Sequence, residues 1–424
     1  MKIALLLPGS GDRFYCENCT RDGSLAAGLI ARGHDVTVCP LYLPLDGARS
    51  PEGVTSPVFY GAVGVYLRQA LPLLRRAPGW VNRAFDSRAA LRFAGALSGA
   101  TDASALGELT VSMLKGEEGN QAAELDDLVE WLAGIEPDVV HISNGLLLGL
   151  AGRIRRRLSV PIVCSLQDED SWVDAMDGPS ADQTWRLMSE RSQDVDLFLP
   201  VSRYYADKMK DRLGLVDSSM RVVPVGIDPC LSLQSCLPFD PPVIGYLSHM
   251  TEDMGLGILV DAFIILKKSP RNRRLRLAVS GGASGSDQGY LKALQRRLHR
   301  AGRGASLSIV PLEKQRQFLS TLTLMSVPVP GGEAFGTFLI EAMASGVPVV
   351  QPDLGGFGEV VRSTGGGIVY EPNTADALAA ALDRLLQDPS EVARLGEIGR
   401  ESVRAHFTLD GMIEQIEMAY RRCL

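Results

Sequence analysis

The residues best placed to do chemistry in this chain are two glutamates, Glu333 and Glu341, separated by seven residues. Glu333 stands in a glycine-rich turn over residues 331–336. Glu341 lies on a helix predicted over residues 337–344, with Gly346 placed to end it. Glycine lets a backbone turn tightly and approach a ligand closely. A helix that begins directly after such a turn presents unpaired N–H groups and the positive end of its dipole, which suits a phosphate.

The two carboxylates indicate what else such a ligand carries. Carboxylates beside a phosphate would repel it, so both side chains should face neutral hydroxyl groups, which donate hydrogen bonds to them. A diphosphate flanked by a ribose and a hexose presents that pattern. The alternative for either glutamate alone is an acidic residue that stabilises the helix dipole.

The residues from Glu333 to Val350, followed by the glycine turn at 355–358, resemble the donor-site signature of retaining glycosyltransferase family 4; Ala334 replaces a more usual glycine. The resemblance implies a GT-B fold, in which two Rossmann-like α/β domains face each other across a cleft. It also implies that Glu341 holds the ribose and that Glu333 lies at the donor sugar as a catalytic residue. The donor-binding residues expected on this basis are Ala334, Phe335, Gly336, Thr337, Glu341, His249, Met254 and Gly281.

Length and composition agree with two such domains. A chain of 424 residues can form two full α/β cores, and no apolar run is long enough to span a membrane. The net charge of −7 argues against broad nucleic-acid binding. We read residues 2–7 as a buried strand and not a signal sequence, and therefore expect a cytoplasmic protein. Seven cysteines in such a chain suggest reduced thiols.

The order of predicted elements divides the chain. Residues 1–235 form the predicted acceptor-side domain, with an insertion at about 46–120. Residues 241–405 form the donor domain, after a proline-rich linker at 229–242. Residues 406–424 form a last helix, which the resemblance implies crosses back to the first domain.

In the first domain, candidate site residues follow predicted strands, where ligands bind in parallel sheets. His141 is either a site residue or a structural histidine. Gln167 stands where many family members have histidine; its amide can hydrogen-bond a sugar but cannot carry a proton, which excludes acid–base chemistry there. Asp168 could orient an acceptor. An acceptor-side loop is expected at Gly9, Ser10 and Gly11.

Two further stretches of this domain have competing interpretations. Cys16 and Cys19 form a CxxC motif, which can be half of a zinc site or a redox pair. No second pair follows at metal-ligand spacing, so we interpret the motif as a loop shaped by small residues near the acceptor site. Residues 67–94 combine six arginines with aromatic residues. Such a stretch is typical of peripheral contact with an anionic membrane, here at the inner face, whereas the acidic total favours a solvated helical pair.

The donor domain departs from the family at its diphosphate clamp. An arginine and a lysine usually follow the first strand, but His249 and Met254 stand at these positions. Charge-assisted contacts contribute roughly 1.5–3 kcal/mol each, so losing two weakens binding by about 10²- to 10⁴-fold. Another cation could substitute, with Arg271, Arg273, Arg274 and Arg316 as candidates, or the donor could carry less phosphate charge.

The predicted function is transfer of a hexose, with retention, from a nucleoside-diphosphate sugar to a hydroxyl of a glycan, lipid or small molecule, without metal or cofactor. The altered clamp leaves open a weakened or inactive relative that binds a sugar nucleotide or a partner. A sugar-nucleotide epimerase on the same fold is a further alternative.

Overall fold

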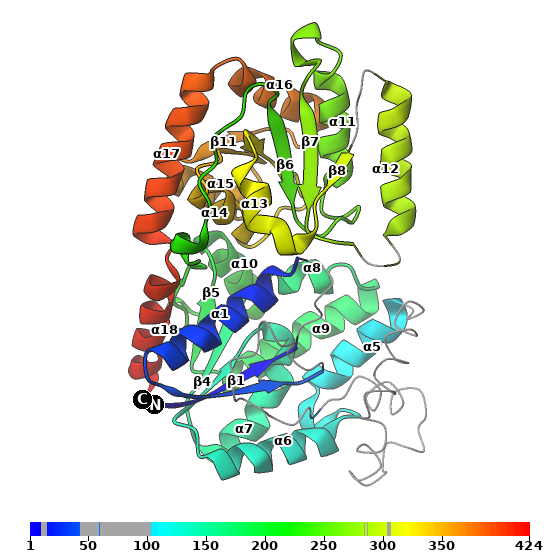
Figure 1. Cartoon of the computed structure of the whole chain (residues 1–424). Helices are drawn as coiled ribbons and strands as arrows, with labels where there is room; N and C mark the ends of the chain where they lie inside the picture. The colour runs from blue at the N-terminus through cyan, green and yellow to red at the C-terminus, as the bar shows by residue number, and fades with distance from the viewer. Residues whose placement is uncertain (10–14, 43–58, 60–102, 284, 286, 303–306) are drawn as a thin grey trace. The chain divides into compact units, whose positions relative to one another are not determined.

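The computed structural model describes residues 1–9, 15–42, 59, 103–283, 285, 287–302 and 307–424. It divides the chain into two compact units. The first comprises Met1–Gly11, Asn18–Val223 and Ile413–Leu424, and the second comprises Asp12–Glu17 and Pro224–Met412. Each unit is an α/β structure built on a parallel sheet, as the sequence predicts (Figure 1).

The first unit has a five-stranded sheet in the order β2-β1-β3-β4-β5. Its strands are near-continuous apolar runs, which is typical of parallel strands covered on both faces. Their bounds are Lys2–Leu7 (β1), Asp35–Pro40 (β2), Val139–Ile142 (β3), Ile162–Leu166 (β4) and Leu197–Pro200 (β5). The strand order reverses between β1 and β3, which is where such sheets bind ligands at their carboxyl ends.

Helices of the first unit connect these strands. They are α1 (Glu17–Ala31), α5 (Ala103–Leu114), α6 (Ala122–Ile135), α7 (Ala151–Leu158), α8 (Glu169–Val173), α9 (Gly178–Arg191) and α10 (Arg203–Leu213). Short 3-10 turns are η3 (Gly116–Glu118), η4 (Gly145–Leu150), η5 (Ser192–Asp194) and η6 (Asp217–Ser219). The arginine-rich stretch at 67–94 lies outside the described residues.

The second unit has a six-stranded sheet in the order β11-β10-β9-β6-β7-β8. The strands are β6 (Val243–Leu247), β7 (Arg276–Ser280), β8 (Leu307–Ile309), β9 (Leu324–Met325), β10 (Val349–Pro352) and β11 (Gly367–Tyr370). The mostly apolar run at residues 324–329 predicts one buried strand by its length and content. In the structure, however, β9 ends after Met325. Pro328 and Pro330 follow, and proline has no N–H for the ladder.

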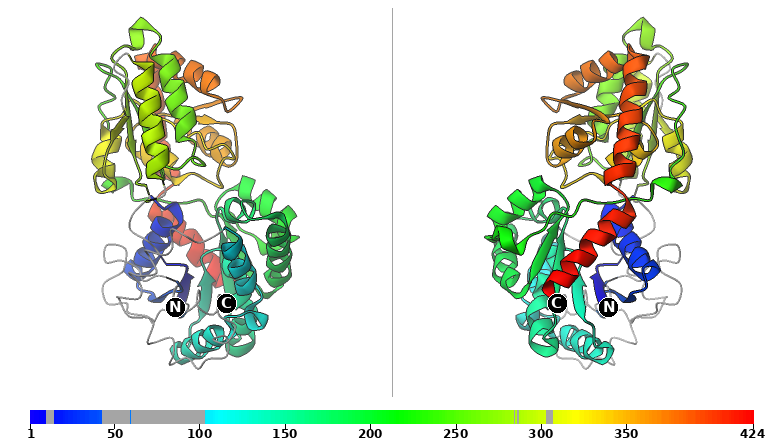
Figure 2. Two further views of the ribbon diagram at one scale, coloured as in Figure 1. Left: turned by 90° about the vertical axis from the view of Figure 1, so that its right-hand side faces the viewer. Right: turned by 90° about the vertical axis from the view of Figure 1, so that its left-hand side faces the viewer.

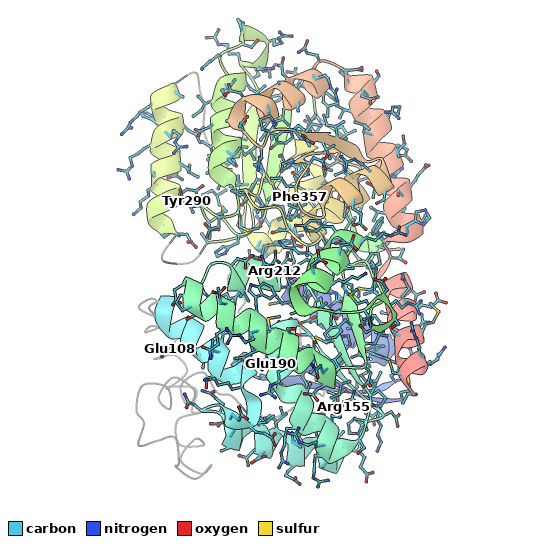
Figure 3. The ribbon with its side chains drawn as sticks, turned by 180° about the vertical axis from the view of Figure 1, so that it is seen from behind. Glu108, Arg155, Glu190, Arg212, Tyr290 and Phe357 are labelled. Atoms are coloured by element: carbon cyan, nitrogen blue, oxygen red, sulfur yellow. The ribbon has the colours of Figure 1, made fainter. Side chains whose placement is uncertain are left out.

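Helices of the second unit are α11 (Leu256–Leu266), α12 (Gln288–Ala301), α13 (Gln315–Ser320), α14 (Thr337–Ala344), α15 (Phe357–Thr364), α16 (Ala375–Leu386) and α17 (Pro389–His406). The 3-10 turns are η7 (Pro229–Leu231), η8 (Pro270–Asn272) and η9 (Leu312–Lys314). The prediction for α14 is confirmed at both ends, because Gly336 precedes it and Gly346 follows it, both with positive φ. Phe357, labelled in Figure 3, is fully buried and packs against Phe338 of α14.

The last helix, α18, spans Leu409–Cys423, and its residues from Ile413 onward belong to the first unit. Figure 2 shows it in red beside the blue α1. Gly28 of α1 allows this approach, because a Cβ there would lie 1.9 Å from Cδ1 of Ile413. Two further residues of α18 hydrogen-bond within the first unit: Tyr420 contacts His141, and Glu417 accepts from Arg32.

Gly355 locks the turn that carries Glu333. Its φ is +59°, and an added Cβ would lie 2.6 Å from the carbonyl oxygen of Glu333. We expect Gly355→Ala to lower the free energy of unfolding by about 2–4 kcal/mol, combining left-handed strain with overpacking. Gly331→Ala is the matched control, since nothing lies within 4 Å of its Cβ position. Denaturant unfolding of both variants tests this, and equal midpoints would contradict it.

Candidate functional site

The turn before α14 is held by a second glycine turn. The amide of Gly356 donates to the carbonyl of Glu333 at 2.7 Å. Gly332 has φ +70°, and a Cβ there would lie 2.7 Å from the amide nitrogen of Gly355. The two turns therefore fix the backbone of Glu333 and the start of α14. Both follow the carboxyl ends of strands, since β9 precedes the first turn and β10 the second.

Neighbouring strands bring two more predicted residues to the same edge of this sheet. β6 lies between β9 and β7. Gly281 follows β7 with φ +131°, and a Cβ there would lie 2.0 Å from the carbonyl oxygen of Ser248, just after β6. His249 follows Ser248 directly. The carboxyl edge of the sheet thus unites His249, Gly281 and the turn before α14, at the place where this sheet type binds ligands.

Glu341 accepts two hydrogen bonds inside the second unit. The hydroxyl of Tyr15 donates to its Oε2 at 2.6 Å, and the side-chain amide of Gln315 donates to the same oxygen at 2.9 Å. Burial raises the pKa of Glu341 to about 7, although these two hydrogen bonds lower it. A carboxylate that already accepts from a hydroxyl and an amide is chemically suited to accept from a ribose diol.

The first amide of α14 has an anionic partner in the structure. The N–H of Thr337 donates to Oε2 of Glu17 at 2.6 Å. Such a short contact is typical of a charge-assisted hydrogen bond. The amide expected to bind diphosphate therefore does bind an anion, but that anion belongs to the chain itself.

Tyr15 lies among three carboxylates. Burial raises the pKa of its phenol well above the usual value, and Glu341, Glu17 and Glu333 raise it further. The phenol is therefore a neutral donor. The backbone N–H of Tyr15 also donates to the carbonyl of Gly281 at 2.6 Å. Sequence reasoning missed Tyr15, because its partners are distant in the chain and no motif marks it.

Three other predicted site residues, two donor-binding and one catalytic, have distinct surroundings. Ala334 and Phe335 are 2% and 3% exposed, and the ring of Phe335 lies 6.0 Å from that of Phe407. Their side chains therefore serve packing. Glu333 is half-buried, and its charge contributes to the raised pKa of Tyr15 and of Tyr246.

The clamp positions lie next to each other around Tyr246. Its hydroxyl donates to the carbonyl of His249 at 3.0 Å and to that of Met254 at 3.1 Å. The imidazole of His249 lies 3.1 Å from the carboxylate of Asp287, so its contacts include an acid. The thioether side chain of Met254 carries no charge.

The substitute cations proposed from the sequence separate into two groups. Arg271, Arg273 and Arg274 precede β7, whereas Gly281 follows it. They lie at the amino edge, since a five-residue parallel strand spans roughly 16 Å. These three are therefore wrong as clamp residues. Arg316 is exposed on α13, directly after Gln315, which touches Glu341.

In the first unit, His141 belongs to a buried network. It is 1% exposed; Nδ1 lies 2.6 Å from the hydroxyl of Tyr420, and Nε2 lies 2.9 Å from Oγ of Ser165. Burial and the nearby Arg21 lower its pKa to about 3. Both ring nitrogens are engaged and the ring is neutral, so the geometry favours the structural alternative over a catalytic role.

Gln167 joins the same network. Its Oε1 accepts from Arg21 at 3.3 Å, and its Nε2 donates to the carbonyl of Ser143 at 2.9 Å. The guanidinium of Arg21 also donates to Ser165 at 3.0 Å. Arg21, 3% exposed, was not singled out from the sequence. The sequence predicts a helix from Asp22 to Ala31, because Leu25, Leu29 and Ile30 share a face, and this predicted start leaves Arg21 outside the helix.

Asp168 follows β4 with φ +60°, the left-handed region that a non-glycine residue rarely adopts. Strain of this kind clusters at functional sites. Next to it, burial raises the pKa of Glu169 to about 7, while its hydrogen bonds from Gly145 and Tyr205 lower it. Gly9 follows β1 with φ +97°. Ser10 and Gly11 lie outside the described residues.

The cysteines correct one expectation. Cys16 and Cys19 are disulfide-bonded, and the other five cysteines are not in a disulfide. With seven cysteines in the chain, the two must be bonded to each other. The prediction of reduced thiols throughout is therefore wrong for this pair. Separately, none of the helices that the structure describes is both long enough and apolar enough to cross a membrane.

Comparison with known sequences gives two family matches. Residues 20–226 match the family described as glycosyl transferase 4-like domain, and residues 234–402 match glycosyl transferases group 1. The D-inositol 3-phosphate glycosyltransferase of Acidothermus cellulolyticus is 28% identical over 306 residues, 68% of this chain and 67% of that protein. That of Rhodococcus opacus is 33% identical over 150 residues, 34% of each. Several such relatives are matched over only 33% to 61% of their own length.

Among solved structures, Anabaena Alr3699/HepE in complex with UDP has a TM-score of 0.71 at 17% identity, with 100% of both chains covered. A likeness at this identity shows the fold, and it confirms the GT-B class predicted from the sequence. Residues 20–226 thus match a glycosyl transferase 4-like domain and residues 234–402 match glycosyl transferases group 1, and the two matches support a transferase enzyme.

Proposed function

We propose that this protein transfers a hexose from a nucleoside-diphosphate sugar to an acceptor hydroxyl with retention of the anomeric configuration. One observation carries the proposal. At the carboxyl edge of the second sheet, the first amide of α14 binds an anion, and Glu341, one turn further on, accepts from a hydroxyl. A donor diphosphate and the ribose diol next to it have the same two functional groups.

Each donor part then has a partner. The diphosphate takes the amides at Gly336 and Thr337, the ribose takes Glu341, and the sugar lies at Glu333. UDP is present in the HepE complex and UDP-glucose in a second one, which supports a nucleotide-sugar donor here. In the first unit, the carboxylate of Asp168 can orient an acceptor hydroxyl.

The chemistry needs stabilisation of a leaving anion. As the bond from the sugar to the diphosphate breaks, negative charge grows on the departing oxygen, and the positive end of α14 favours that charge. The acceptor's proton passes to the same phosphate oxygen. This scheme assigns no proton transfer to His141 or Gln167, in agreement with their buried contacts.

Nucleotide release tests the proposal. The full chain is incubated with uridine, guanosine and adenosine diphosphate hexoses, without and with a hydroxyl acceptor, and released nucleotide is measured. We expect slow hydrolysis of one donor and faster release with an acceptor, with the anomeric configuration of the product read by NMR. No release and no binding heat with any donor would refute the proposal.

The protonation of Glu341 gives a pH dependence. Burial raises its pKa to about 7. A ribose diol donates to the carboxylate and not to the acid, so the donor binds the deprotonated protein. The Kd for UDP should therefore fall about tenfold between roughly pH 6 and pH 8. Glu341→Gln is the control, because its remaining pH dependence reports the nucleotide's own phosphate. Equal slopes for the two proteins would contradict the assignment.

A further inference from the structure

Residues Tyr15 and Glu17 occupy both polar partners that the proposed donor needs. The N–H of Thr337 donates to Glu17 at 2.6 Å, and Glu341 accepts from Tyr15 at 2.6 Å. An amide has one hydrogen, so Glu17 and a donor phosphate cannot both take that bond. In chemical terms, the Glu17 carboxylate stands in for the diphosphate and the Tyr15 hydroxyl stands in for the ribose.

The negative charges around Tyr15 also oppose the binding of a diphosphate. Tyr15 is surrounded by Glu17, Glu333 and Glu341, which all raise its pKa. With Glu17 in place, a diphosphate would enter next to three carboxylates, and Met254 supplies no opposing charge. Removing Glu17 from the amide relieves that repulsion and leaves the amide open to phosphate.

The residue that carries the competing carboxylate lies between two cysteines that form a disulfide. The Cys16–Cys19 bond encloses Glu17, at the first residue of α1. A closed ring of this kind restricts the backbone of the residues inside it, and opening it returns conformational freedom to them. The ring thus holds Glu17 in the geometry that competes for Thr337.

We propose that Tyr15 and Glu17 form a built-in competitor for the donor and that the Cys16–Cys19 disulfide keeps it engaged, so that reduction raises donor affinity. A dithiol reductant supplies two electrons and two protons; the S–S bond becomes two thiols, and the reductant closes to its own disulfide. This proposal rests on the proposed function, because it takes the donor to be a nucleoside diphosphate.

Titration with UDP tests the proposal on the full chain. The protein with its disulfide verified by mass spectrometry is compared with protein reduced by dithiothreitol. We expect reduction to tighten the Kd for UDP about tenfold, close to 1.4 kcal/mol. Cys16→Ser/Cys19→Ser should bind UDP with the Kd of the reduced protein, and dithiothreitol should not change that Kd. Cys230→Ser/Cys236→Ser, which changes two exposed free cysteines, should keep the full response.

A second variant isolates the carboxylate. Glu17→Gln in the oxidised protein should also tighten UDP binding about tenfold, because the charge that mimics phosphate is gone. Glu118→Gln, at an exposed carboxylate on η3, should change nothing. Weaker UDP binding by Glu17→Gln, or one Kd in both redox states, would overturn the proposal.

Hydrogen exchange separates this proposal from the proposed function. The amide of Thr337 should exchange faster after reduction, with no nucleotide present, since its partner is released. If UDP binds to neither form but exchange still responds to reduction, the donor assignment fails, while the redox-dependent release of Glu17 from Thr337 stands. If exchange at Thr337 is the same in both redox states, the switch fails, whether or not UDP binds.

Discussion

Glu341→Ala should weaken UDP binding about a hundredfold. A ribose diol donates two hydrogen bonds to a carboxylate, and hydrogen bonds to charged groups contribute roughly 1.5–3 kcal/mol each. Tyr15 and Gln315 already show that this side chain accepts from a hydroxyl and from an amide. Calorimetric titration of UDP measures the effect directly, without any acceptor.

Kinetic measurements should show that Glu341 contributes to donor binding and not to the chemical step. The ribose is remote from the bond that breaks, so the contact exists in both ground and transition states. Removing it should raise the KM for the donor and leave kcat nearly unchanged. Glu313→Ala, at an exposed carboxylate on η9 in the same unit, is the matched control. An unchanged Kd in Glu341→Ala would place the nucleotide elsewhere.

Glycine and proline residues at the ends of helices and strands explain which parts of the fold the sequence could predict. α14 begins and ends as expected because the flanking Gly336 and Gly346 adopt positive φ, which other residues rarely accept. β1 likewise occupies residues 2–7 as predicted, since a continuous apolar run ends at a proline and a glycine. In both cases the deciding residues are neighbours in the chain.

The first helix shows the limit of that reasoning. α1 begins at Glu17, five residues before the predicted start. Its first turn contains Cys19 and polar residues, so the apolar periodicity appears only after Asp22. The disulfide at its start had no sequence signature that distinguishes it from a loop or half of a metal site.

The site residues separate according to how far apart their partners lie. Glu341 and the amide of Thr337 could be named from one motif, because they share a helix. The neighbours that determine their chemistry could not: Tyr15 and Glu341 are 326 positions apart, and Glu17 and Thr337 are 320 apart. His141 is similar, since its partner Tyr420 lies 279 positions away. Such pairs form only when the chain folds.

His249→Arg combined with Met254→Lys should strengthen UDP binding by about 10²- to 10⁴-fold, because two charge-assisted contacts to the diphosphate would be added. The backbone of both positions is fixed by the hydroxyl of Tyr246. An arginine at 249 would also face Asp287, whose carboxylate lies 3.1 Å from the present imidazole. That acid offsets part of the new charge, so Met254→Lys alone should give the larger share.

The pattern among the single variants decides what the altered clamp means. Met254→Lys should lower the Kd for UDP and weaken its dependence on reduction, because the added cation offsets the carboxylate of Glu17. Met418→Lys, at a 39% exposed position on α18, adds the same charge outside the second unit and should leave the Kd unchanged. A gain in affinity with faster transfer would mean that the clamp limits a working enzyme. A gain without transfer would mean that the chain binds sugar nucleotides and lacks the chemistry, whereas no gain would place the diphosphate away from α14.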